Sequence, residues 1–216
     1  MLEVQQSMRP ETEFTPAWRI PFWRTVYTSD ENIDFMKNWI LDNEEKLISQ
    51  YNQNSRNDGG TGLGTNSLTA QYNSFNLFKE TENIPEFQDF YQFLRIQYNL
   101  FMREAQAQTR NCVMYAWANV LRPGQSVAKH YHGASHYSYL SGNMHFDNYE
   151  TITRYYNPFN EQYYDCPNQK GGITFFPSYI FHEATEFKQE GKRVSMAFDL
   201  FDVNHLDFLD GNYVNF

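Results

Sequence analysis

The chain has 216 residues, of which 41% are hydrophobic and 18% aromatic, a composition typical of a globular protein with a sizeable core. Its 17 basic and 26 acidic residues give a net charge of −9, and we therefore expect neither nucleic acid nor an anionic membrane as a partner, because both would be repelled. The two cysteines, Cys112 and Cys166, are too few for a disulfide framework and lack the spacing of a thiolate zinc site.

Residues 1–11 lack the positively charged region and the following apolar core of a signal peptide, and no apolar run in the chain approaches the roughly 20 residues that span a bilayer. We therefore expect a cytoplasmic protein. Prolines among aromatic residues predict an extended N-terminal segment with a strand near Trp23–Tyr27. Ser29 and Asp30 favour the start of a helix whose apolar residues recur every three to four positions as far as Tyr51.

Residues 52–74 are rich in Asn, Ser, Gly and Thr and predict a long loop. Its glycines lack the preceding strand and following helix of a phosphate-binding fingerprint, so we interpret the loop as structural or as a mobile rim. The clearest helix covers residues 84–108 and is expected to pack against a sheet. Its apolar stripe consists of Phe87, Phe90, Tyr91, Leu94, Tyr98, Phe101 and Met102.

After Arg110 the apolar pattern changes to that of strands. Residues 112–121 predict a strand buried on both faces, and further strands are expected at 126–132, 138–147, 171–176 and 193–202. Residues 147–169 form a polar, tyrosine-rich excursion that we interpret as a long loop at the wall of a pocket, together with loop 52–74. The expected fold is α+β and mainly β, in one domain: helical support and loop in 1–110, a β core in 111–203 and a tail in 204–216.

Two histidines one residue apart, His130 and His132, lie where a strand is expected. Residues two apart on a strand point to the same face, so both imidazoles can reach one metal ion. The alternative is that they are ordinary polar residues on a solvated strand face. Among the other histidines, His136 is the best substitute ligand, while His145 and His205 are interpreted as bystanders.

A second group of polar residues lies near the C-terminal end of the β core. His182 follows the predicted strand at 171–176, and Arg193 and Ser195 share one face of an otherwise apolar strand. If that face points inward, Arg193 is a buried cation that needs an anion; if it points outward, Arg193 is an ordinary surface residue. Asn119, the one polar residue of strand 112–121, is either a hydrogen-bonded core amide or part of the site.

Taken together, these segments resemble the 2-oxoglutarate and Fe(II)-dependent oxygenases of the type found in phages and marine bacteria. The resemblance rests on Trp117-Ala-Asn-Val-Leu-Arg-Pro-Gly-Gln-Ser, His130-x-His132, Leu140-Ser-Gly142, Gly172-Ile-Thr-Phe-Phe-Pro-Ser178, His182 and Arg193-x-Ser195. Upstream, Gly60-Thr-Gly-Leu and Ser67-Leu-Thr also resemble that family. The resemblance implies a double-stranded β-helix, a cupin-like jelly roll, backed by the N-terminal helices.

The resemblance also implies a chemistry. His130, His132 and His182 would hold Fe(II), with His132 in the place of the usual carboxylate. Arg193 and Ser195, with Asn119, would bind the cosubstrate 2-oxoglutarate. O2 and an unknown substrate, a small molecule or a peptide, would then give a hydroxylated product, succinate and CO2. If a phage encodes the chain, its location would be the host cytoplasm, and the oligomeric state stays open.

Two other interpretations remain open. Gly124-x5-His130-x-His132 also matches the start of the first cupin motif, which favours a metalloenzyme that does not use 2-oxoglutarate; however, no Glu follows His132 before Glu150. The other alternative is a noncatalytic jelly-roll module, such as a phage structural or binding protein. Metal analysis separates this module from both enzymes, and 2-oxoglutarate binding separates the two enzymes.

Overall fold

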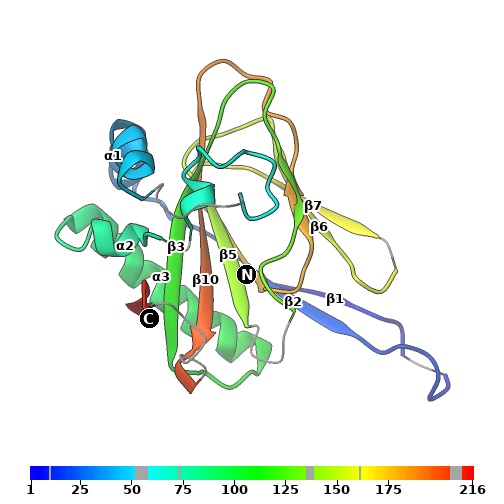
Figure 1. Ribbon diagram of the computed structural model, residues 1–216. Helices are drawn as coiled ribbons and strands as arrows, with labels where there is room; N and C mark the ends of the chain where they lie inside the picture. The colour runs from blue at the N-terminus through cyan, green and yellow to red at the C-terminus, as the bar shows by residue number, and fades with distance from the viewer. Residues whose placement is uncertain (10, 52–57, 73, 135–138, 161, 205–210) are drawn as a thin grey trace.

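Two antiparallel β-sheets, with helices on the outer side of the larger one, make up the computed structural model of the chain (Figure 1). The structure describes residues 1–9, 11–51, 58–72, 74–134, 139–160, 162–204 and 211–216. Every strand pairing within these residues is antiparallel. The predicted α+β, mainly β arrangement is therefore confirmed, and two facing antiparallel sheets are what a jelly-roll core requires.

The larger sheet has the order β1-β2-β8-β5-β10-β3-β11. Its strands are β1 (Leu2–Gln6), β2 (Arg19–Val26), β8 (Gly172–Pro177), β5 (Leu140–His145), β10 (Arg193–Asp202), β3 (Cys112–Leu121) and β11 (Val214–Asn215). The smaller sheet has the order β4-β9-β6-β7, formed by β4 (Val127–His130), β9 (His182–Ala184), β6 (Ile152–Tyr156) and β7 (Tyr163–Pro167). The helical elements are α1 (Asp30–Tyr51), the 3-10 turn η2 (Thr69–Gln71), α2 (Leu77–Glu80) and α3 (Pro85–Ala105).

The two long helices occur where the three-to-four spacing predicts them; α3 runs along the outer side of the larger sheet, and α1 packs against α3 (Figure 1). Helix α3 begins with a proline at its first turn and ends at Gln106, whose φ of 55° is the left-handed conformation that commonly stops helices. All seven residues of the predicted stripe are buried in one core cluster with residues of β3, β8 and β10. No helix in the described part of the chain is both long and apolar enough to cross a membrane.

Three segments differ from the sequence-based expectations. The N-terminal region is not only helical support: β2 confirms the strand expected near Trp23–Tyr27, and together with β1 it extends the larger sheet through β8. The excursion at 147–169 is not a long loop, because β6 and β7 form a hairpin whose burial alternates with period two along β6. The tail contains β11, which pairs with β3. Apart from β2, these strands are short and lack the apolar runs that predict buried strands.

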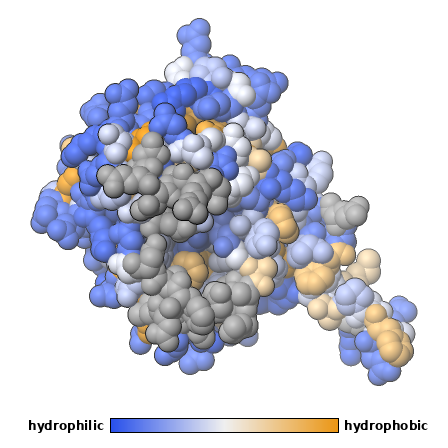
Figure 2. Space-filling view, viewed as in Figure 1, coloured by the Kyte–Doolittle hydropathy of each residue, from blue (hydrophilic) through white to orange (hydrophobic). Residues whose placement is uncertain are grey.

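The surface seen from the side of Figure 1 is mainly hydrophilic, in keeping with the net charge of −9 (Figure 2). Hydrophobic side chains gather on the extension that carries the connection from β1 to β2. Met8 and Phe14, in that connection, are 92% and 88% exposed.

Strand β10 separates the core from the space between the sheets. Val194, Met196, Phe198 and Leu200 belong to the core cluster beneath the helices. Arg193, Ser195, Ala197 and Asp199 have the opposite parity and line a cavity between the sheets. The polar stripe that the sequence suggested therefore points inward.

Close packing across β5 and β10 makes Gly142 a position that tolerates no side chain. A Cβ atom at Gly142 would lie 2.2 Å from Cζ of Phe198, whose ring is fully buried against Phe175. We expect Gly142→Ala to lower the free energy of unfolding by about 1–3 kcal/mol, the usual cost of overpacking. Urea denaturation measures this loss. In a Phe198→Leu background the loss should shrink; strictly additive effects would contradict the proposed clash.

Candidate metal centre

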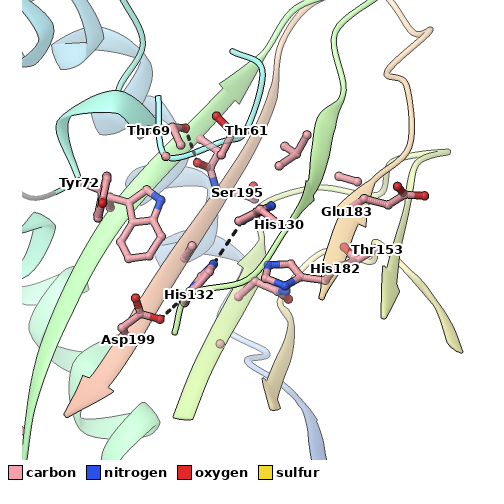
Figure 3. Close-up of a pocket in the computed structure, with 18 of the residues that line it drawn as sticks. Thr61, Thr69, Tyr72, His130, His132, Thr153, His182, Glu183, Ser195 and Asp199 are labelled. Atoms are coloured by element: carbon pink, nitrogen blue, oxygen red, sulfur yellow. Dashed lines mark hydrogen bonds and ion pairs between the residues drawn. The ribbon is translucent and has the colours of Figure 1, made fainter. Parts of the chain in front are cut away.

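Three histidine rings converge at one end of the cavity (Figure 3). His130 is the last residue of β4 and lies directly opposite His182, the first residue of the antiparallel β9. His132 follows two residues after β4, and its backbone N–H donates to the carbonyl of Ser178 at 3.0 Å. One nitrogen of each ring lies within 4.8 Å of the other two. The structure thus brings together the three histidines that the sequence nominated as ligands.

The hydrogen bonds of the rings define which nitrogen is free. Nδ1 of His130 lies 2.8 Å from the carbonyl oxygen of Ala128, and Nδ1 of His182 lies 3.1 Å from that of Ile180. Nδ1 of His132 lies 2.6 Å from Oδ1 of Asp199. A carbonyl or carboxylate oxygen only accepts, so each Nδ1 carries a proton and donates, which leaves Nε2 as the nitrogen that can bind a metal.

The free nitrogens face one another, because Nε2 of His130 and Nε2 of His132 lie 3.3 Å apart. Two lone pairs at this distance repel unless a cation lies between them. Imidazole nitrogens suit iron, zinc, copper and nickel. The donor set therefore fits a divalent transition metal better than it fits a solvated strand face.

Burial keeps two of these rings neutral. Burial, and then the neighbouring His132, lowers the pKa of His130 to about 4. Burial, and then His130 and His132, lowers the pKa of His182 well below its ordinary value. Near neutral pH both rings are unprotonated at Nε2 and ready to bind a metal without first losing a proton.

A buried arginine lies further along the same cavity, which measures about 790 Å3 including its opening to solvent. Arg193 is only 1% exposed, and burial lowers its pKa to about 10, so it remains a cation at neutral pH. Its Nε donates to Oγ1 of Thr151 at 3.0 Å and its Nη1 to Oγ of Ser195 at 3.3 Å. Within the described residues no carboxylate forms an ion pair with it. Arg193 is thus a buried cation without an anion.

Neighbouring polar groups also lack partners. His145 accepts from Nη2 of Arg193 at its Nδ1, at 3.4 Å, and burial followed by Arg193 lowers the pKa of His145 well below its ordinary value. Nε2 of His145 and Oδ1 of Asn143 are buried without a hydrogen-bond partner in the described structure, and both residues line the cavity. Buried orphans of this kind indicate a polar ligand or water. His145 is therefore not the bystander that the sequence suggested.

The other nominated residues also take definite places. Ser195 lies opposite Asn119 on β3, and both line the cavity. Asn119 accepts a hydrogen bond from Thr69, so it is both hydrogen-bonded and exposed to the site. His136 and His205 lie outside the described residues. Asp199 was not among the residues nominated from the sequence. It lies on the same face of β10 as Arg193 and Ser195, so following that face as far as position 199 would have found it.

The described part of loop 52–74 forms a packed wall of the cavity (Figure 3). Its Thr61 carbonyl accepts from the backbone N–H of Ala128 at 2.8 Å, and Thr69 is bonded to Asn119. Ala128 is also the residue whose carbonyl orients His130. Residues 58–72 thus have a structural role in the wall of the cavity. By contrast, the hairpin at 147–169 contributes only Thr153 to the described lining of the cavity.

Comparison with known proteins agrees with this geometry. Residues 115–199, which include all six nominated site residues, match the family model described as "Putative 2OG-Fe(II) oxygenase", and this confirms the resemblance over that segment. No curated protein sequence matches the chain at a significant level.

Several solved structures share the fold. AviO1 from Streptomyces viridochromogenes Tue57 is 11% identical with a TM-score of 0.56, over 84% of this chain and 90% of that one. The viral collagen prolyl hydroxylase vCPH from Paramecium Bursaria Chlorella virus-1 is 16% identical with a TM-score of 0.53, over 84% and 96%. A Pseudomonas putida prolyl-4-hydroxylase is 9% identical with a TM-score of 0.53, over 84% and 92%. At these identities the likeness establishes the fold alone.

Metal binding can be tested on the apoprotein with Co(II), which is stable in air. At 100 times its Kd, Co(II) should raise the free energy of unfolding of the wild type by about 2.7 kcal/mol, because the ion binds only the folded state. His182→Ala should lose most of this gain, as measured by urea denaturation with and without the ion. His136→Ala should keep it; a loss there instead of at His132→Ala would contradict the three-histidine ligand set.

Proposed function

We propose, taking the family match of residues 115–199 as the premise, that this chain is an Fe(II)- and 2-oxoglutarate-dependent dioxygenase that hydroxylates a small molecule or a peptide. One observation carries the proposal: a single cavity has three metal-ready Nε2 atoms at one end and, at the other, the buried cation Arg193, which has no carboxylate partner among the described residues. A metal and a dianion are the two groups that such a cavity would stabilise most.

The chain's own residues have distinct tasks in this proposal. His130, His132 and His182 would hold the ion through Nε2, and three protein ligands would leave room at the ion for cosubstrate and O2. When bound, Fe(II) supplies the redox chemistry that couples decarboxylation of 2-oxoglutarate, to succinate and CO2, with oxidation of the substrate. Wall residues would exclude bulk water from this reaction.

Arg193 would bind the distal carboxylate of 2-oxoglutarate. Its planar fork can donate two parallel hydrogen bonds to a carboxylate, and the Ser195 hydroxyl lies beside it as a further donor. Asn119, opposite Ser195, extends the polar floor of the cavity. The substrate would then enter past Trp117, Tyr72 and Tyr131, aromatic residues that line the cavity.

A cupin-type metalloenzyme without 2-oxoglutarate is the second candidate. The observation in its favour is that the three ligands include no carboxylate. Arg193 argues against it, because a buried cation without an anionic ligand costs several kcal/mol. A noncatalytic module has less support, since it would bury the Nε2 lone pairs of the three histidines and the charge of Arg193 without a ligand to compensate them.

The first test of the function is succinate formation. Purified protein with Fe(II), ascorbate, 2-oxoglutarate and O2 should release succinate slowly even without a substrate, and His182→Ala should release none. Succinate is measured by mass spectrometry. Metal binding without any succinate, or succinate formation that survives His182→Ala, would contradict the oxygenase assignment.

The second test concerns Arg193→Ala. Its affinity for 2-oxoglutarate should fall on the order of 100-fold, as expected when one partner of a buried charge pair is truncated. Calorimetry on Co(II)-loaded protein measures this affinity, and the Co(II) content should remain that of the wild type. Arg122→Ala is the matched control, because Arg122 pairs with Glu44 outside the cavity. Unchanged affinity in Arg193→Ala would remove Arg193 from the site.

A further inference from the structure

The three histidines differ in what holds their Nδ1 atoms. His130 and His182 donate to neutral backbone carbonyls. His132 alone donates to a carboxylate, that of Asp199 on β10, at 2.6 Å. The ring that stands where the family usually has a carboxylate is therefore the ring that contacts one.

Asp199 has few other partners. It is buried, and its Oδ1 also accepts from Oγ of Ser141 at 2.6 Å, from the residue directly opposite on β5. Within the described residues no Lys or Arg forms an ion pair with it. A buried carboxylate without a cation is costly, and a metal ion held by His132 would compensate its charge.

Hydrogen bonds hold His132 at both its backbone and its side chain. The backbone N–H of His132 donates to the carbonyl of Ser178, and the Ser178 hydroxyl lies 3.0 Å from that of Ser141. Ser141 donates to Asp199, which in turn accepts from His132. This closed circuit fixes the ring orientation and its Nδ1–H tautomer, with Nε2 directed at the other two histidines.

We propose that Asp199 is a positioning residue that supplies, through the His132 ring, the negative charge that a three-histidine metal site otherwise lacks. Three neutral imidazoles bring no charge to a divalent ion. A carboxylate that accepts the Nδ1 proton makes the imidazole a stronger and more anionic ligand. The charge of the usual carboxylate ligand is thus kept in the site but placed one residue further from the metal. This inference rests on the metal site of the proposed function.

The test is the Co(II) affinity of Asp199→Asn, measured by competition with a chelating dye. The amide keeps the size of the side chain but removes its charge, so we expect about 10- to 100-fold weaker binding, the usual effect of losing such a partner. Asp202→Asn is the matched control on the same strand, because Asp202 pairs with Arg110 and does not line the cavity. It should leave the affinity unchanged.

The same substitution of Asp199 in a His132→Asp variant distinguishes a role in supplying charge from a purely structural role. In His132→Asp the ligand itself is a carboxylate, and Asp199 lies beside it as a like charge. Adding Asp199→Asn there should strengthen Co(II) binding or leave it unchanged. A loss as large as that in the wild-type background would overturn the proposal, because Asp199 would then act directly on the metal or on the fold.

A measurement on the unmodified protein covers the case in which Asp199→Asn fails to fold. In the Zn(II)-loaded wild type, the Nδ1 proton of His132 should resonate downfield of those of His130 and His182 in the proton NMR spectrum, since it alone donates to a carboxylate. An ordinary shift for His132 would overturn the inference. Wild-type protein that binds neither ion would overturn the metal site itself, whereas equal Co(II) affinity in Asp199→Asn overturns only the role of Asp199.

Discussion

The register of β10 between β3 and β5 determines both the core and the site. Because side chains alternate along a strand, a slip of one residue would exchange the two faces. Val194, Met196, Phe198 and Leu200 would then enter the cavity, while Arg193 and Asp199 would enter an apolar core. Burying two unpaired charges there would cost several kcal/mol each. The same pattern that builds the core therefore places the polar groups of the cavity.

The two sheets divide the chemistry between them. The smaller sheet and the residues that follow β4 carry the three histidines, while the larger sheet carries Arg193, Ser195, Asn119 and Asp199. Neither sheet holds a complete site, so the cavity depends on their packing against each other. Loop residues 58–72 connect the two halves, since Thr61 bonds to β4 and Thr69 bonds to β3. Binding of a metal and an anion would stabilise the folded state by compensating the buried groups of both sheets.

The features that the sequence predicted correctly are those that depend on the spacing of apolar and polar residues close together in the chain. The long helices, the buried strand at 112–121 and the shared face of Arg193 and Ser195 follow from periods of 3.6 and 2. The sequence did not predict the hairpin of β6 and β7, because these short segments are rich in polar and tyrosine residues and have neither a long apolar run nor a regular alternation of apolar and polar residues. Nor does spacing show that His182 lies opposite His130, since the pairing of β4 with β9 joins residues 52 positions apart in sequence. Long-range pairings of this kind depend on the whole fold.

The charges of the cavity would also allow the proposed three-histidine site and a 2-oxoglutarate cosubstrate to coexist. Among the described lining residues, Arg193 is the one buried cation and Asp199 the one acidic group without an Arg or Lys partner, because Glu183 contacts Arg154. A divalent metal brings two positive charges and 2-oxoglutarate brings two negative charges. With Arg193 next to the distal carboxylate and Asp199 behind the metal, the loaded cavity would be neutral as a whole and also nearly neutral at each end. Without Asp199, the metal end would carry an excess of positive charge in a buried site, where uncompensated charge is most costly.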